Sequence, residues 1–226
     1  MKIDTQLPYS EKDIEKYFNE TPWWVWAGGI LAFFIGASLN EWVGIIAGLG
    51  VTVGLYIHAA GPLKDRQIDE LWHTIAKSRE DEAYRVANYD KEDVIRDATY
   101  FFGYAEQVAP GKTHRTKEGD DKRVRHNHQK LIYMIYGRDQ LIVFDETICL
   151  ENLWDGADRT EEFYWNDVSS VSFDEKWDAL QITVGPRIVV YPLTGEGADL
   201  HSAYSAQAQE VANAVRLVLR ERKAAR

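Results

Sequence analysis

The chain of 226 residues contains a single cysteine, Cys149, which excludes a disulfide framework and a thiolate zinc cluster. Positive charge is also scarce, because 26 Lys and Arg residues stand against 36 Asp and Glu residues, for a formal net charge of -10. This balance argues against a protein that coats nucleic acid with its whole surface, but it leaves room for a local basic site.

The motifs of common enzymes are missing as well. The sequence has no GxxxxGK[ST] phosphate loop, no HExxH zinc motif, no GxSxG nucleophile turn and no GxGxxG fingerprint between a strand and a helix. Cys149 follows Ile148 in an apolar segment, a setting typical of a core cysteine rather than a nucleophile. We therefore expect a protein that is not an enzyme, without catalytic residues, cofactor or metal.

Charge is almost absent between Trp23 and Ala60, where Glu41 is the only charged residue. Two apolar runs, Trp23–Ser38 and Trp42–Ala60, flank a short connection. As helices they would extend about 24 and 28 Å, close to a hydrocarbon core of ~30 Å. The pattern predicts a transmembrane helical hairpin, and a hairpin buried in a protein core is the alternative.

Basic residues surround this segment but are missing from its connection. Lysines and arginines precede and follow the two runs, and the connection has none. By the positive-inside rule, both termini are expected in the cytoplasm of a protein of the bacterial inner membrane. The basic residues used here are Lys2, Lys12, Lys16, Lys64, Arg66 and Lys77.

Small residues recur at four-residue spacing in both runs, as Gly28, Ala32 and Gly36 do in the first, and they create faces on which helix backbones can approach closely. Such faces serve either to pack the two helices of one hairpin or to pack several copies of the chain, and the sequence leaves both alternatives open. The glycines expected to mediate this packing are Gly28, Gly36, Gly44, Gly48, Gly50 and Gly54.

The periodicity of apolar residues divides the chain into four parts. Residues 1–21 form an amphipathic segment whose short helix opens at Ser10 and Asp13, residues 22–61 the hairpin, residues 62–97 a helical connector and residues 98–226 a β-rich cytoplasmic domain. In the connector, the helix expected over Lys64–Asn88 places an apolar stripe on one face, consisting of Ile68, Leu71, Trp72 and Ile75.

Short segments rich in β-branched and aromatic residues predict the strands of the last part, and an amphipathic helix ends it. The expected arrangement is a curled antiparallel sheet or barrel closed by that helix, so the fold class is an α+β membrane protein. The expected strands are Tyr100–Val108, Lys130–Tyr136, Gln140–Phe144, Phe163–Trp165, Val168–Phe173, Ala179–Val184 and Arg187–Tyr191.

The segments QLIVFDETICL, FYWNDVSSVSF, LQITVGPRIVVYPL and VANAVRLVL, between Leu131 and Leu219, resemble a bacterial pleckstrin-homology-like (PH-like) domain. The resemblance implies a strand, a W-x-D-V-x-x-V step, a hairpin and a closing helix. A membrane hairpin fused to such a domain is similar in architecture to small bacterial membrane effectors, including those of antiphage defence.

The most basic segment is Lys112–Lys130, in which seven basic residues accompany only Glu118, Asp120 and Asp121. Arginine, lysine and histidine pair well with phosphate oxygens, so the segment is the candidate site for a nucleotide, an oligonucleotide or an anionic lipid headgroup. A solvated hairpin tip is the alternative. The candidate ligand-binding residues are Lys112, His114, Arg115, Lys122, Arg123, Arg125, His126 and His128.

Together these features predict a homo-oligomeric membrane protein whose PH-like domain senses an anionic ligand or a partner protein. In this hypothesis the bound ligand gates a transmembrane pore or a membrane-perturbing bundle, as an ion channel of antiviral defence would. The alternative is a non-catalytic scaffold or adaptor anchored in a bilayer beside a membrane complex.

Overall fold

The computed structural model describes residue 3 and residues 7–19, 23–38, 41–60, 63–195 and 201–224. The chain divides into two compact units, Leu7–Ile68 and the remainder, Met1–Gln6 with Asp69–Arg226. Within the described residues the protein is α+β, with five α-helices and three β-sheets.

The smaller unit begins with helix α1 (Glu11–Phe18), which a capping box starts. The Ser10 hydroxyl accepts the amide of Asp13, and the Asp13 carboxylate accepts the amide of Ser10. The prediction of a helix start at these two residues is therefore confirmed. The helix buries Ile14, Tyr17 and Phe18 on one face.

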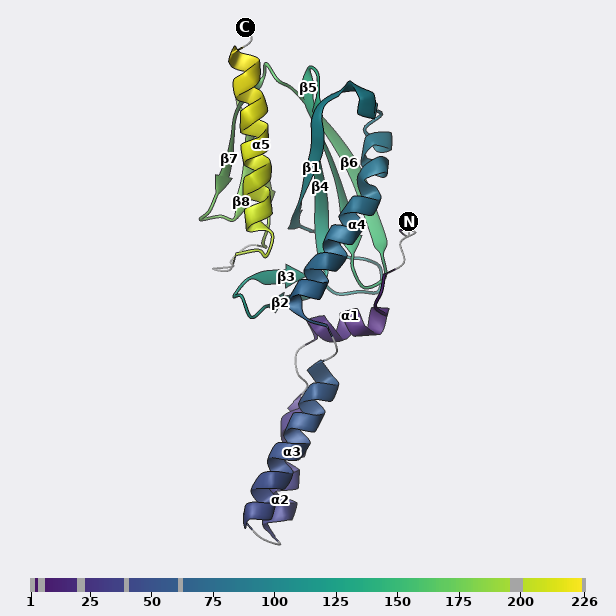
Figure 1. Cartoon of the computed structure of the whole chain (residues 1–226), viewed down its shortest axis with the longest axis vertical. Helices are drawn as coiled ribbons and strands as arrows, with labels where there is room; N and C mark the ends of the chain where they lie inside the picture. The colour runs from purple at the N-terminus through teal and green to yellow at the C-terminus, as the bar shows by residue number, and fades with distance from the viewer. Residues whose placement is uncertain are drawn as a thin grey trace. The chain divides into compact units, whose positions relative to one another are not determined.

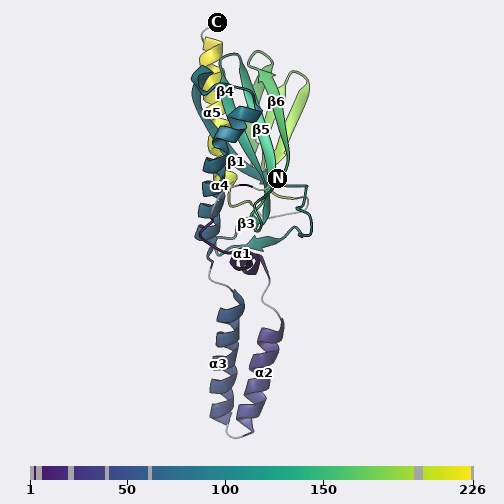
Figure 2. The same ribbon diagram turned by 90° about the vertical axis from the view of Figure 1, so that its right-hand side faces the viewer.

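Helices α2 (Trp23–Ala37) and α3 (Glu41–Ala60) follow and run side by side as a hairpin (Figure 2). In the described part of the chain, however, no helix is both long and apolar enough to cross a membrane. This finding contradicts the predicted transmembrane hairpin, and with it the membrane-protein class, the inner-membrane location and the ion channel.

Helix length is the physical reason for this correction. Helix α2 has 15 residues, and at 1.5 Å per residue it extends only about 22 Å, well short of a ~30 Å hydrocarbon core. In α3, Glu41 and His58 limit the uninterrupted apolar stretch to 16 residues, or about 24 Å. The prediction took both runs as long enough from apolar composition alone, and neither helix is both long and apolar enough to cross.

The larger unit contains a four-stranded antiparallel sheet with strand order β1-β4-β5-β6 (Figure 1). Its strands are β1 (Val94–Tyr104), β4 (His128–Gly137), β5 (Gln140–Cys149) and β6 (Trp154–Tyr164). A second antiparallel sheet has three strands, β7 (Val168–Asp174), β8 (Ala179–Val184) and β9 (Arg187–Pro192). The two-stranded hairpin of β2 (Thr116–Glu118) and β3 (Val124–His126) is separate from both, so the prediction of one curled and closed sheet is wrong.

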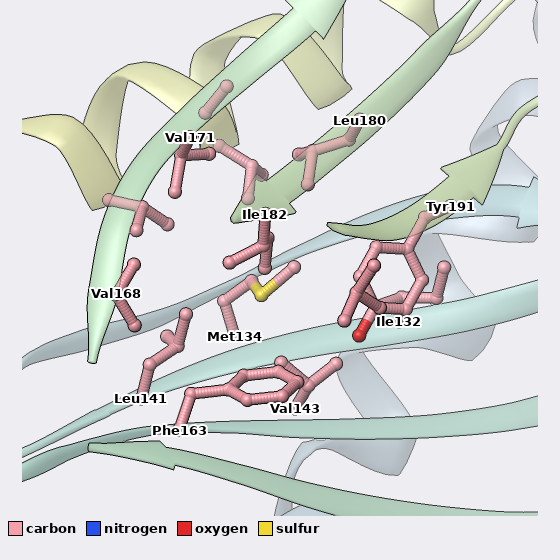
Figure 3. Close-up of a cluster of buried hydrophobic side chains, with 14 of the residues drawn as sticks. Ile132, Met134, Leu141, Val143, Phe163, Val168, Val171, Leu180, Ile182 and Tyr191 are labelled. Atoms are coloured by element: carbon pink, nitrogen blue, oxygen red, sulfur yellow. The ribbon is translucent and has the colours of Figure 1, made fainter. Parts of the chain in front are cut away.

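The hydrophobic core lies between the two larger sheets. Successive side chains of a strand point to opposite faces, so Ile132 and Met134 face the three-stranded sheet while Tyr133 faces away. Figure 3 shows Met134, Phe163 and Ile182 of the two sheets pointing toward one another. Helix α5 (Ser205–Ala224) completes this core with Ala208, Val211, Ala212, Val215, Val218 and Leu219.

Helix α4 (Asp65–Val86) lies across the other face of the four-stranded sheet, and a 3-10 turn (Lys91–Asp93) leads from it to β1 (Figure 1). The Tyr133 hydroxyl donates to the Ala76 carbonyl, and the Arg79 guanidinium binds the buried Glu146 carboxylate at 2.9 and 2.7 Å. The apolar stripe predicted for this helix, Ile68, Leu71, Trp72 and Ile75, is fully buried, which confirms that prediction.

Candidate functional site

The β2–β3 hairpin is an excursion between β1 and β4, and it contains half of the residues predicted to bind a ligand. Its strands pair Thr116 with His126 and Glu118 with Val124. Val124 also pairs in parallel with Ser202, because its amide donates to the His201 carbonyl. The hairpin is therefore joined to the segment that enters α5.

Arg125 is used inside the protein. The residue is only 3% exposed, and its side chain donates two hydrogen bonds to Asp69 of α4, at 2.9 and 2.8 Å. Two further hydrogen bonds of 3.0 Å reach Asp121 at the hairpin tip, and they hold the pKa of that carboxyl below its ordinary value. Arg125 is thus a structural cation between helix and hairpin.

Lys112 and Arg115 neutralise a buried carboxylate rather than facing solvent. The Lys112 Nζ lies 3.0 Å from Oε2 of Glu151, and the Arg115 Nη1 lies 3.5 Å from its Oε1. The amide of Asn127 donates to the same Oε1 at 2.7 Å. Because a buried carboxylate is costly without such partners, these two cations stabilise the base of the hairpin.

The three histidines of the segment gather beside this carboxylate. Nε2 of His114 lies 3.1 Å from Nδ1 of His126, and the ring of His114 stacks on Tyr104. His128 accepts the amide of Ala109 at Nε2, so its Nδ1 carries the proton toward Asn127. Burial, and next the proximity of His114, lowers the pKa of His126 to about 3 and that of His128 to about 4.

Lys122 and Arg123 are the predicted residues that remain at the surface. Lys122 turns the hairpin tip with a φ of 60°, and its exposed Nζ lies 3.1 Å from Glu118. Both side chains line a groove of about 750 Å³ between the hairpin tip, the β7–β8 turn and the start of α5. The groove is lined by Asp121, Lys122, Arg123, Phe173, Glu175, Lys176, His201, Ser205, Ala206 and Gln209.

Sequence reasoning placed Lys112–Lys130 in one site, and the structure divides it in two. Lys176, His201 and Phe173 were missed, because they lie about fifty residues or more from the hairpin along the chain. The signal that joins them is the pairing of Val124 with Ser202, an isolated bridge between short segments. Such a pairing has no local sequence pattern.

The groove does not contain a recognisable nucleophilic constellation. The Ser205 hydroxyl donates to Asp178 at 2.6 Å, and Nδ1 of His201 lies 3.9 Å from the same carboxylate oxygen. In an acyl-transfer triad the imidazole contacts the hydroxyl, whereas here the carboxylate lies between the two. Among the residues with described placement there is also no group of three or more His, Cys, Asp or Glu residues that would hold a metal ion.

The hairpin glycines fall into two groups. A Cβ on Gly44 would lie 2.6 Å from the backbone nitrogen of Ala37, and one on Gly36 would lie 2.7 Å from Cα of Gly44. Gly28 and Gly48 are equally close to side chains of the facing helix, at 2.6 Å from Leu55 and 2.9 Å from Phe33. These four glycines therefore form the seam inside the hairpin.

Gly50 and Gly54 lie outside that seam. A Cβ at either position would meet no atom of the described part of the chain within 4 Å, and both residues are exposed. Sequence spacing did not distinguish Gly50 and Gly54 from Gly44 and Gly48 of the seam, because the two glycines of each pair are four residues apart.

In comparisons with known proteins, no family model, no curated protein and no solved structure matches the chain.

Proposed function

We propose that this chain is a non-catalytic interaction protein that assembles with further copies of itself through the outer face of α3. The observation that carries this proposal is the open pair of glycines, Gly50 and Gly54, on a helix whose other glycines already pack against α2. Among the residues whose placement is described, no atom lies within 4 Å of a Cβ at either position.

The outer face of α3 has the relief that close helix packing needs. Each residue advances about 100° around an α-helix, so Gly50 lies about 160° from Gly48 and faces away from α2. Ile46 and Val53 flank it and are 71% and 54% exposed. A shallow glycine surface beside a ridge of branched side chains allows two backbones to approach closely.

A second copy of the chain is the partner that this surface fits best. The ridge of one α3 matches the glycine surface of another, so the face is self-complementary, as a two-fold symmetric interface requires. Between Trp23 and Ala60 the chain carries a single charged residue, Glu41, so the partner surface must be apolar. Large exposed apolar patches of this kind mark interaction sites.

The larger unit supports the role of an interaction domain. Four strands and three strands enclose a core that a C-terminal helix completes, an arrangement in keeping with the PH-like resemblance between Leu131 and Leu219. In this proposal the domain presents its surface grooves to a ligand or partner, and assembly through α3 multiplies those grooves.

Sedimentation velocity of the full chain over a wide range of concentrations tests this proposal. We expect the chain to associate reversibly, and we expect Gly50→Leu to weaken association at least tenfold because the new side chain holds the backbones apart. Ser172→Leu adds the same side chain to an exposed strand position of the larger unit and should leave association unchanged. A wild-type chain that stays monomeric, or a Gly50→Leu variant that assembles normally, would overturn the proposal.

A further inference from the structure

The groove beside α5 combines cations from segments that are distant in the sequence. Lys122 and Arg123 come from the β2–β3 tip, and Lys176 comes from the β7–β8 turn. All three are exposed and line the same space of about 750 Å³, which lies within the size range of small-molecule sites.

The charge of this groove is positive in a protein that is acidic as a whole. Two acids, Asp121 and Glu175, share the lining with the three cations. Asp121 is already bound by two hydrogen bonds from Arg125, whose guanidinium also binds Asp69. The lining therefore carries one more cation than acids, while the formal charge of the chain is -10.

Two of the groove cations form no ion pair with any residue that the structure describes. Arg123 and Lys176 have no ion pair there, although the Lys176 Nζ lies 5.1 Å from the centre of the Trp177 ring. Lys112, Arg115 and Arg125, by contrast, each bind a carboxylate. The contrast separates cations that hold the fold from cations that can receive a ligand.

The remainder of the lining defines the shape of that ligand. Phe173 packs against the core and offers an apolar surface to the groove, and Ala206 adds to it. Gln209 and His201 supply polar contacts at the edge. An aromatic ring surface beside lysine and arginine side chains suits a flat body that carries phosphate groups.

We propose that this groove binds a nucleoside diphosphate, with its phosphates at Arg123, Lys122 and Lys176 and its base against Phe173. The site lies within the larger unit and does not rest on the assembly of the hairpin. Its chemistry is electrostatic at one end and apolar at the other, so the affinity for the phosphates falls as salt concentration rises.

Isothermal titration calorimetry of the full chain with ADP, pyrophosphate and adenosine tests the two ends of the site separately. We expect ADP to bind at least tenfold more tightly than pyrophosphate, and adenosine to bind least. Vesicles of phosphatidylcholine with phosphatidylglycerol, in a flotation assay, present the same phosphate chemistry as a lipid headgroup. Binding to those vesicles with no response to ADP would assign the site to a lipid source and overturn the nucleoside proposal.

A pair of matched double variants locates the binding. Arg123→Ala with Lys176→Ala removes two groove cations and should weaken ADP binding at least thirtyfold. Lys77→Ala with Arg138→Ala removes the same charge from exposed positions outside the groove lining and should change it less than threefold. Equal losses of ADP affinity in the two double variants would show that only the net charge of the protein matters, and would overturn the proposal. The absence of any heat of binding with all three compounds would also overturn it.

Phe173→Leu tests the apolar end. Phe173 is half-buried and packs against the core, so circular dichroism must first show that the variant is folded. In the folded variant we expect ADP to lose affinity while pyrophosphate keeps it. Equal affinity of the variant and the wild type for ADP would contradict a base placed against this ring.

Discussion

Arg125 and Asp69 are 56 residues apart in the chain, yet the guanidinium of one binds the carboxylate of the other through two parallel hydrogen bonds. This pair joins the first turns of α4 to the β2–β3 hairpin, and the Tyr204 hydroxyl donates to the same carboxylate at 3.0 Å. The contact shows that the most basic stretch of the sequence contributes a structural cation to the fold.

Arg125→Met should destabilise the protein by about 3 kcal/mol, because removing one partner of a buried ion pair leaves the other charges without compensation. Urea unfolding followed by circular dichroism measures the loss. Arg123→Met, two residues away and exposed, is the matched control and should change the free energy of unfolding by less than about 0.5 kcal/mol. Similar losses in both variants would show that Arg125 is not the connecting cation.

The buried histidines predict a loss of stability in mild acid. The pKa values of His126 and His128 in the folded protein, about 3 and about 4, lie below their ordinary value of 6.5, so the unfolded chain takes up protons first. The contribution of these two histidines to the free energy of unfolding is therefore fully present above about pH 7. It falls below about pH 6.5, by about 1.4 kcal/mol per pH unit for each histidine. The decrease for His128 ends near pH 4 and that for His126 near pH 3.

Urea unfolding between about pH 7 and about pH 5 measures this slope before most carboxylates titrate. NMR titration of the histidine ring protons gives the control, because both rings should stay neutral in the folded protein across that range. A titration of either ring near pH 6.5 would contradict the prediction.

The two glycine groups should respond in opposite ways to the same substitution. Gly44→Ala places a methyl group 2.6 Å from the backbone of Ala37, which cannot move aside without separating the helices, and we expect a loss of about 1 to 3 kcal/mol. Gly50→Ala meets open space and should stabilise α3 by up to about 1 kcal/mol through helix propensity. Thermal melting of the helical signal at low protein concentration compares the two, and equal melting temperatures would contradict the assignment of the seam.

Cys149 should be inert in the folded protein. The side chain is fully buried, and burial raises the pKa of its thiol, so little thiolate is present near neutral pH. A disulfide reagent such as Ellman's should react with it only after unfolding in urea, at a rate limited by opening of the fold. Rapid reaction of the native protein would show a reactive cysteine instead.

Much of the fold follows from periodicity in the sequence. An amphipathic helix was expected at the end of the chain, and α5 buries Ala208, Val211 and Val218 on one face. The strands expected over Val168–Phe173, Ala179–Val184 and Arg187–Tyr191 match β7, β8 and β9 to within one residue at each end. Alternating or stripe-forming apolar residues make such elements visible, because one face of each must be buried.

Strand β6 shows where this reasoning fails. Only Phe163–Trp165 was expected to be extended, whereas the strand runs over Trp154–Tyr164 and carries four acids and an arginine. It lies at the edge of its sheet, where charged side chains prevent pairing with another chain. Because of the same charged residues, the strand lacks the alternation of apolar and polar residues by which strands are predicted from sequence.

The candidate site was only partly visible for a different reason. The abundance of cations in Lys112–Lys130 is a local property, but the carboxylates that engage them, Asp69 and Glu151, lie in other elements. Composition locates charge, and tertiary contacts decide which charges remain available to a ligand. Arg125 is buried against Asp69, whereas Arg123 is exposed and has no ion pair among the described residues.

The connection between β1 and β4 has a consequence for engineering. The two strands are neighbours in the sheet, and Tyr104 pairs with Gln129, so the intervening excursion leaves and returns at adjoining positions. A graft that exchanges only the tip, residues 119–123, keeps both ends of the excursion in place and leaves Arg125 in its strand. The chain thus offers a stable frame on which loops of different charge can be displayed to select different ligands.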